Sequence, residues 1–138
     1  MKYRFFEHTA DAKFQAYGKT LGEAFSNAAE AMTSIMIKPE SVKPKTAKEI
    51  TVEGKDEKAL LYNFLEEFLF LLDTDGFILN KIRRIKITKN RNYLLEAEAA
   101  GDNAEKYETS GDVKAVTYSE MEIKKEKDKY MVQVVVDL

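Results

Sequence analysis

The segment from Leu60 to Leu72 constrains the fold more than any other part of this sequence. It reads Leu-Leu-Tyr-Asn-Phe-Leu-Glu-Glu-Phe-Leu-Phe-Leu-Leu, and its apolar side chains cover more than one face of a helix. A helix of this kind is stable in water when other layers of structure cover it. We therefore expect a helix from Glu57 to about Leu72, capped by Asp56 and buried inside a layered domain.

An earlier segment carries the pattern of an amphipathic helix. Thr20 and Glu23 fit a capping box, in which a hydroxyl and a carboxylate bond otherwise unpaired backbone amides. The helix should end near Ile37, before Pro39. Its apolar stripe, at helical spacing, consists of Leu21, Ala24, Phe25, Ala28, Ala31, Met32, Ile35 and Met36.

Most of the remaining chain favours β-strands, because apolar and polar residues alternate between turn-forming residues. A glycine stop at Gly76 separates the second helix from these later strands. Together the segments predict one α+β domain over residues 1–138, with two main helices packed on a largely antiparallel or mixed β-sheet. The expected strands are Lys2–Glu7, Ala12–Tyr17, Glu49–Gly54, Phe77–Lys89, Tyr93–Ala99, Val113–Lys124 and Lys129–Val136.

The composition excludes several classes of function. No cysteine is present, so disulfides, thiolate metal sites and cysteine nucleophiles are ruled out. His8 is the only histidine, which removes most zinc-enzyme patterns, and a net charge of -2 gives no overall attraction to nucleic acid. No apolar run is long enough to span a bilayer, and the first residues lack the features of a signal peptide, so we expect a cytoplasmic protein with no membrane partner.

The turn His8-Thr9-Ala10-Asp11 is the first place where side chains could carry chemistry. It lies between the first two expected strands. Asp11 or Thr9 could simply bond the local backbone, as in many turns. Alternatively, the polar groups of this turn could form part of a binding site.

The last residues of the sequence form a second candidate. Val132 to Val136 predict a buried strand, after which the Asp137 carboxylate stands beside the terminal carboxylate of Leu138. Neighbouring anions repel one another unless a cation or a basic side chain compensates them. Either this end is solvated and frays, or Asp11 joins these carboxylates and together they bind Ca²⁺ or Mg²⁺.

The third candidate is Lys114, which interrupts the start of an apolar strand after an acidic loop, 101–111. It could lie in solvent with its stem on apolar neighbours, or it could meet a phosphate or a carboxylate of a partner.

The basic residues from Lys81 to Arg91 could likewise form a solvated face of a strand, or they could contact phosphates. Asp73-Thr74-Asp75-Gly76 begins like a calcium-binding loop, but Arg84 stands where its final glutamate is required.

Five pieces of the sequence, in this order, resemble the archease family, and they span the whole chain. They are His8-Thr9-Ala10-Asp11; Leu21-Gly22-Glu23-Ala24-Phe25 with Ala28-Ala29-Glu30-Ala31-Met32; the stretch from Leu65 to Thr74; Val113-Lys114-Ala115-Val116-Thr117-Tyr118; and Val136-Asp137-Leu138.

The resemblance implies a non-catalytic activator of an RtcB-type tRNA-splicing RNA ligase. Such an activator promotes guanylylation and multiple turnover of the ligase, and it meets tRNA through that partner. The resemblance also implies a divalent cation, Ca²⁺ before Mg²⁺ or Mn²⁺, held by Asp11, Asp137 and main-chain or terminal oxygens of Leu138. It assigns partner activation to Lys114 together with Asp11 and Asp137. Possible supporting residues are His8, Thr117 and Ser119.

The sequence departs from the family pattern at two points. Many archeases have a histidine directly after the Thr-Tyr pair, where this chain has Ser119. A second histidine is common in the loop before the lysine, and this chain has none there; Tyr107 is the residue that could occupy its position. Two alternative functions remain open: a chaperone-like metal-binding module, which would need a large exposed apolar patch, and a small metal-dependent phosphoester hydrolase, which would need more ligands and a general base.

Overall fold

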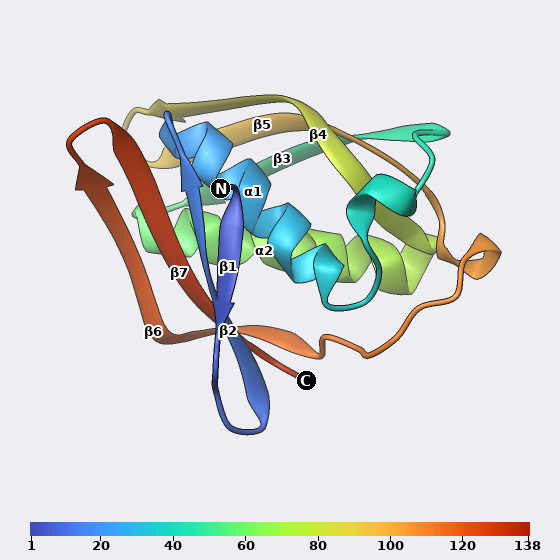
Figure 1. Cartoon of the computed structure of the whole chain (residues 1–138). Coiled ribbons are helices and arrows are strands. Elements are labelled where there is room, and N and C mark those ends of the chain that lie inside the picture. The colour runs from blue at the N-terminus through green and yellow to red at the C-terminus, as the bar shows by residue number, and fades with distance from the viewer.

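The apolar helix expected from the sequence is α2 (Glu57–Asp75), and it lies at the centre of the fold (Figure 1). The computed structural model describes residues 1–138, and in it α2 contacts strands of both β-sheets. Asp56 caps the helix by accepting a backbone N–H of its first turn at 2.8 Å. Gly76 ends the helix with φ 65°, a left-handed conformation that glycine adopts without steric cost.

One face of α2 supplies much of the core. Along the second half of the helix, Leu69, Leu71 and Leu72 are only half-buried and pack against the edge of the core. Phe70 points to solvent and is 59% exposed. The expectation of a buried helix is therefore confirmed for one face of α2, whereas its remaining surface is half-buried or exposed. The buried residues of α2 are Ala59, Leu60, Leu61, Phe64, Leu65 and Phe68.

Helix α1 (Leu21–Ser34) begins where the capping signal places it and ends slightly earlier than expected. The Thr20 hydroxyl accepts the N–H of Glu23 at 3.0 Å. The Glu23 carboxylate accepts the N–H of Lys19 at 3.1 Å, so the second bond of the capping box reaches one residue further back than usual. Because α1 touches strands of both sheets, the two helices together tie the sheets into one core.

The seven strands divide into two antiparallel sheets, which the alternation pattern alone did not specify. Two short 3₁₀ helices, η1 (Pro39–Ser41) and η2 (Ala104–Lys106), lie in the connections. The four-stranded sheet has the order β1 (Tyr3–Phe6), β2 (Asp11–Gly18), β7 (Lys129–Asp137), β6 (Ala115–Glu126), and the three-stranded sheet has the order β3 (Thr46–Gly54), β5 (Tyr93–Asn103), β4 (Phe77–Lys89).

A single hydrophobic core joins all of these layers, which confirms the expected α+β class and a single domain. Val132, Val134 and Val136 of β7 face this core, and the intervening residues of β7 therefore face the other side of the sheet. Neither helix combines the length and the apolar character needed to cross a membrane.

The expected acidic loop begins with three residues that belong to a strand, 101–103. Strand β5 runs to Asn103, four residues beyond the expected end at Ala99, and Asp102 within it is only 3% exposed. Its carboxylate accepts bonds from the hydroxyl of Tyr107 at 2.8 Å and the ammonium of Lys106 at 3.2 Å. The backbone N–H of Asn103 also donates to it and is the main reason that the pKa of Asp102 lies below its usual value.

Candidate functional site

Three strand ends meet at one end of the four-stranded sheet. Asp11 is the first residue of β2, Asp137 is the last of β7, and Ala115 is the first of β6. The register pairs Asp11 with Asp137, and Asp137 with Ala115. Residues that are far apart in the sequence therefore lie side by side at this end.

The Asp11 and Asp137 side chains share one face of the sheet, because directly paired residues on antiparallel strands project to the same side. The neighbouring residues Phe14 and Val136 point into the core, which places both aspartates on the outer face. Asp137 forms no hydrogen bond or salt bridge through its carboxylate. Like charges directly opposite one another are unfavourable unless a cation compensates them, and within the chain only Asp11 of the two has such a partner, His8.

Lys114 is held at the same end by its backbone. Its N–H donates to the carbonyl oxygen of Asp137 at 2.8 Å, one residue before β6 begins. The side chain is exposed, and its ammonium forms no salt bridge within the chain. Leu138 follows Asp137 directly and is also exposed, so its main-chain oxygens lie at this end of the sheet.

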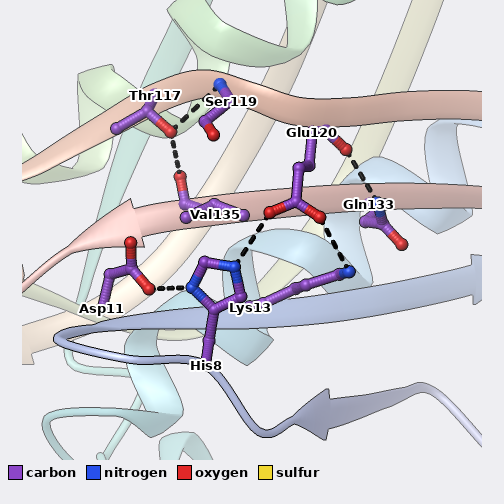
Figure 2. A network of polar contacts seen from close by, with 8 residues as sticks. All are labelled: His8, Asp11, Lys13, Thr117, Ser119, Glu120, Gln133 and Val135. Atoms are coloured by element: carbon purple, nitrogen blue, oxygen red, sulfur yellow. Dashed lines mark hydrogen bonds and ion pairs between the residues drawn. The ribbon is translucent and has the colours of Figure 1, made fainter.

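His8 is bonded on both sides (Figure 2). Its Nδ1 contacts Oδ1 of Asp11, and its Nε2 lies 2.9 Å from Oε2 of Glu120. Two carboxylate partners accept hydrogen bonds from both ring nitrogens, an arrangement that fits the charged imidazolium. The bond to Asp11, followed by that to Glu120, raises the pKa of His8 above its ordinary value.

Glu120 and Lys13 are members of this cluster that sequence reasoning did not identify. The ammonium of Lys13 donates to Oε1 of Glu120 at 3.0 Å, while His8 uses the other oxygen. The bond to His8 first, and then the bond to Lys13, lowers the pKa of Glu120. No local pattern marks Glu120, because 112 residues separate it from His8.

A bulge of several residues in β6 brings Glu120 to this position. Thr117 pairs with Val135 and Glu122 pairs with Gln133, so residues 118–121 stand opposite a single residue of β7. Glu120 has φ 54°, a left-handed conformation that is uncommon for a residue other than glycine. Its carbonyl oxygen accepts the side-chain amide of Gln133 at 2.7 Å, which fixes the bulge against the neighbouring strand.

Thr117 and Ser119 stabilise the bulge through hydrogen bonds of the Thr117 hydroxyl with the backbone. The Thr117 hydroxyl donates to the carbonyl of Val135 at 2.8 Å and accepts the N–H of Ser119 at 3.2 Å. Between them in the sequence, Tyr118 stacks on Tyr62 of α2, with ring centroids 4.5 Å apart and ring planes at 5° to each other. Tyr118 is still 54% exposed.

Tyr107, considered above as a replacement for a family histidine, lies elsewhere. Its hydroxyl bonds the buried carboxylate of Asp102 at the end of the three-stranded sheet and accepts the N–H of Lys43 at 2.9 Å. It is part of that internal network and makes no hydrogen bond to the cluster around His8.

The donors at the sheet end fit a hard cation by their chemistry, because carboxylate and main-chain oxygens are the ligands of Ca²⁺ and Mg²⁺. Nowhere do three or more His, Asp or Glu side chains form a group that could hold a metal ion by themselves. Asp11 and Asp137 supply two side chains, so further ligands would have to come from main-chain oxygens, water or a partner.

Comparisons with known proteins show the family to which the chain is similar. A model of the Archease protein family matches residues 3–138. The protein archease of Thermococcus kodakarensis is 43% identical over 141 residues, which cover 99% of each chain. That of Pyrobaculum islandicum is 42% identical over 139 residues, covering 99% of this chain and 95% of the relative.

Two solved structures share the fold. The solution structure of Methanobacterium thermoautotrophicum protein 1598 is 36% identical, covers 99% of both chains and superposes with a TM-score of 0.85. A Thermotoga maritima crystal structure, described as an archease and possible chaperone, has a TM-score of 0.58 at 18% identity over 96% of this chain and 94% of that one, a likeness of fold alone. The family model matches nearly the whole sequence, and relatives named archease are 42–43% identical to it, so the chain belongs to the archease family.

Proposed function

We propose that this protein is a non-catalytic activator of an RtcB-type RNA ligase, acting through the exposed end of its four-stranded sheet. Membership of the archease family supports this function. The observation that carries it is the register that sets Asp11 opposite Asp137, with Lys114 bonded to the same residue. Charged groups from three distant segments meet on an open edge, where a partner can reach them.

In this proposal, Asp11, Asp137 and main-chain oxygens of Leu138 hold a divalent cation, with Ca²⁺ ahead of Mg²⁺ and Mn²⁺. The cation would compensate the two opposed carboxylates and offer its open coordination positions to ligands of the ligase. The order of preference is the one that the resemblance to archeases implies, since carboxylate and main-chain oxygens are ligands for both Ca²⁺ and Mg²⁺.

The Lys114 ammonium would meet a phosphate of the bound nucleotide or a carboxylate of the ligase. Guanylylation gathers phosphates, metal ions and carboxylates that repel one another in the ligase site. Contacts that form only in the activated complex lower the barrier to that step. The ligase performs the chemistry and contacts the tRNA, and both proteins work in the cytoplasm.

The test combines the purified protein with its cognate ligase, GTP, Mn²⁺ and cleaved tRNA, and follows guanylylation and multiple-turnover ligation. Asp11→Ala, Asp137→Ala and Lys114→Ala are compared with Asp128→Ala, an exposed residue in the turn at the other end of β6 and β7. We expect stimulation by the wild type and the control, and loss of most of it in the three site variants. Circular dichroism checks that all are folded.

Full stimulation by Asp11→Ala and Lys114→Ala would rule out this end of the sheet as the activating site. No stimulation by the wild-type protein at equimolar amounts would rule out the ligase as its partner.

A further inference from the structure

The cluster around His8 does more than neutralise charge, because it links two backbone segments that are both under constraint. One is the turn before β2, where Ala10 has φ 63°, and the other is the β6 bulge, where Glu120 has φ 54°. Left-handed conformations cost free energy in residues with a Cβ, so surrounding contacts must maintain them. His8 bridges the two segments by contacting Asp11 and Glu120, and Lys13 of β2 bonds the other oxygen of Glu120.

The bridge is partly sheltered on the side of the turn and β2, whereas the Glu120 side chain at its other end is 46% exposed. The side chains of His8, Asp11 and Lys13 are 25%, 23% and 21% exposed, respectively. Isolated exposed salt bridges contribute little to stability because water screens them and their side chains lose freedom. A network that joins several charges across two strands and a turn restricts its members more strongly than one such pair.

The contact with His8 determines which carboxylate oxygen of Asp11 is free to bind another group. His8 contacts Oδ1, and Oδ2 makes no hydrogen bond within the chain. A carboxylate held through one oxygen keeps the other oriented, as in metal sites where an outer partner orients a ligand. Since His8 lies between Asp11 and Glu120, the two carboxylates occupy opposite sides of the ring and do not converge on one point.

We propose that Glu120 is a positioning residue for Asp11: from the β6 bulge it holds His8, and His8 holds the Asp11 carboxylate in place beside Asp137. This inference rests on the proposed role of Asp11 in the function above. It assigns the bulge a purpose, since a regular β6 strand would carry no residue that turns back to meet His8.

The first experiment measures the order of the turn by ¹⁵N relaxation in the wild type and in Glu120→Ala. Alanine keeps the Cβ, so the backbone cost at this φ does not change. The matched control is Glu122→Ala, two residues later in β6, whose carboxylate contacts only Lys124 at 3.6 Å. We expect order parameters of the Thr9, Ala10 and Asp11 amides to fall from about 0.85 toward about 0.6 in Glu120→Ala alone.

Glu120→Gln separates positioning from charge. Its amide oxygen can still accept the ring N–H, so the turn should remain ordered in this variant. Unchanged order of residues 9–11 in Glu120→Ala would overturn the inference.

The second experiment measures Ca²⁺ affinity by calorimetry. We expect a loss of about ten-fold or more in both His8→Ala and Glu120→Ala, because outer partners of metal ligands have effects of that size. Tighter binding in His8→Ala would mean that the imidazolium only competes with the cation, and would overturn the positioning role.

Ligase stimulation distinguishes this inference from the function on which it rests. A disordered turn combined with full stimulation in Glu120→Ala would show that Glu120 orders the turn but that activation of the ligase does not depend on this order. That result would overturn the functional part of the inference and leave the proposed function standing. If the wild type neither binds Ca²⁺ nor stimulates the ligase, the proposed function fails, and the relaxation measurement still decides whether Glu120 positions Asp11.

Discussion

At the scale of single residues, two aspartates show how the surroundings determine what a carboxylate does. Asp102 is buried, and Asn103, Lys106 and Tyr107 satisfy its oxygens, so it stabilises the end of β5. Asp11 is partly exposed, bonded through one oxygen, and faces a second carboxylate across the strand pair. The first arrangement is complete within the chain, whereas the second leaves Oδ2 of Asp11 without a hydrogen bond.

His8 predicts a specific dependence of stability on pH. Its pKa is raised in the folded protein by the bonds to Asp11 and Glu120, so folding binds its proton more tightly. The stabilisation is complete below the unfolded pKa, about 6.5, and is lost as the pH rises through the folded value. The melting temperature of the wild type should therefore exceed that of His8→Gln at about pH 6, and the difference should shrink at alkaline pH.

Glu120→Gln is the control for this prediction and should weaken the pH dependence. A difference between wild type and His8→Gln that grows with pH would contradict the assignment of a charged His8.

At the scale of elements, backbone contacts between strands set limits that side-chain patterns do not reveal. Gly101 of β5 lies against β4 so closely that an added Cβ would sit 2.0 Å from the carbonyl oxygen of Ile78. Backbone on both sides cannot yield as a flexible side chain can. The end of β5 and the placement of Asp102 beside it therefore depend on the absence of a side chain at this position.

Gly101→Ala should destabilise the protein by about 2 kcal/mol or more, since overpacking a close contact typically costs 1–3 kcal/mol. The matched control is Gly22→Ala in α1, where the added Cβ would meet only a methyl group of Ile85 at 3.1 Å. Alanine also favours the helix by about 1 kcal/mol over glycine. Urea denaturation compares the two, and equal stability of both variants would contradict the close approach.

At the scale of the whole molecule, the two helices determine whether the two sheets unfold together. Each helix contacts strands from both sheets, and Phe25 of α1 stacks on Phe64 of α2 with ring centroids 6.2 Å apart. Phe64 also meets Phe68 edge-on at 5.1 Å. Because the sheets share this core, we expect them to unfold in one cooperative transition.

Phe64→Ala should lower the free energy of unfolding by about 3–5 kcal/mol, because it opens a cavity in the shared core. Phe70→Ala, which truncates an exposed ring on the same helix, should change it by no more than about 0.5 kcal/mol. Far-ultraviolet circular dichroism and tyrosine fluorescence should report the same urea midpoint in each variant. Separate midpoints would show that the sheets unfold independently.

Local features of the fold followed from the sequence by itself. The caps at Thr20 and Asp56, the glycine stop at Gly76 and the approximate positions of the seven strands were all predicted. These features depend on residues within a few positions of one another, so their physical chemistry is complete in a short segment. The family resemblance likewise directed attention to Asp11, Asp137 and Lys114.

Other features were decided only by the tertiary structure. The division of the strands into two sheets, the burial of Asp102, the β6 bulge and the contact of Glu120 with His8 all depend on which distant segments become neighbours. Alternation shows that a strand has two faces, but not which strand pairs with it or where the register shifts. Asp11, Asp137 and Lys114 were thus identified from the sequence, whereas the contacts of Glu120 with His8 and Lys13 arise only when segments more than a hundred residues apart pack together.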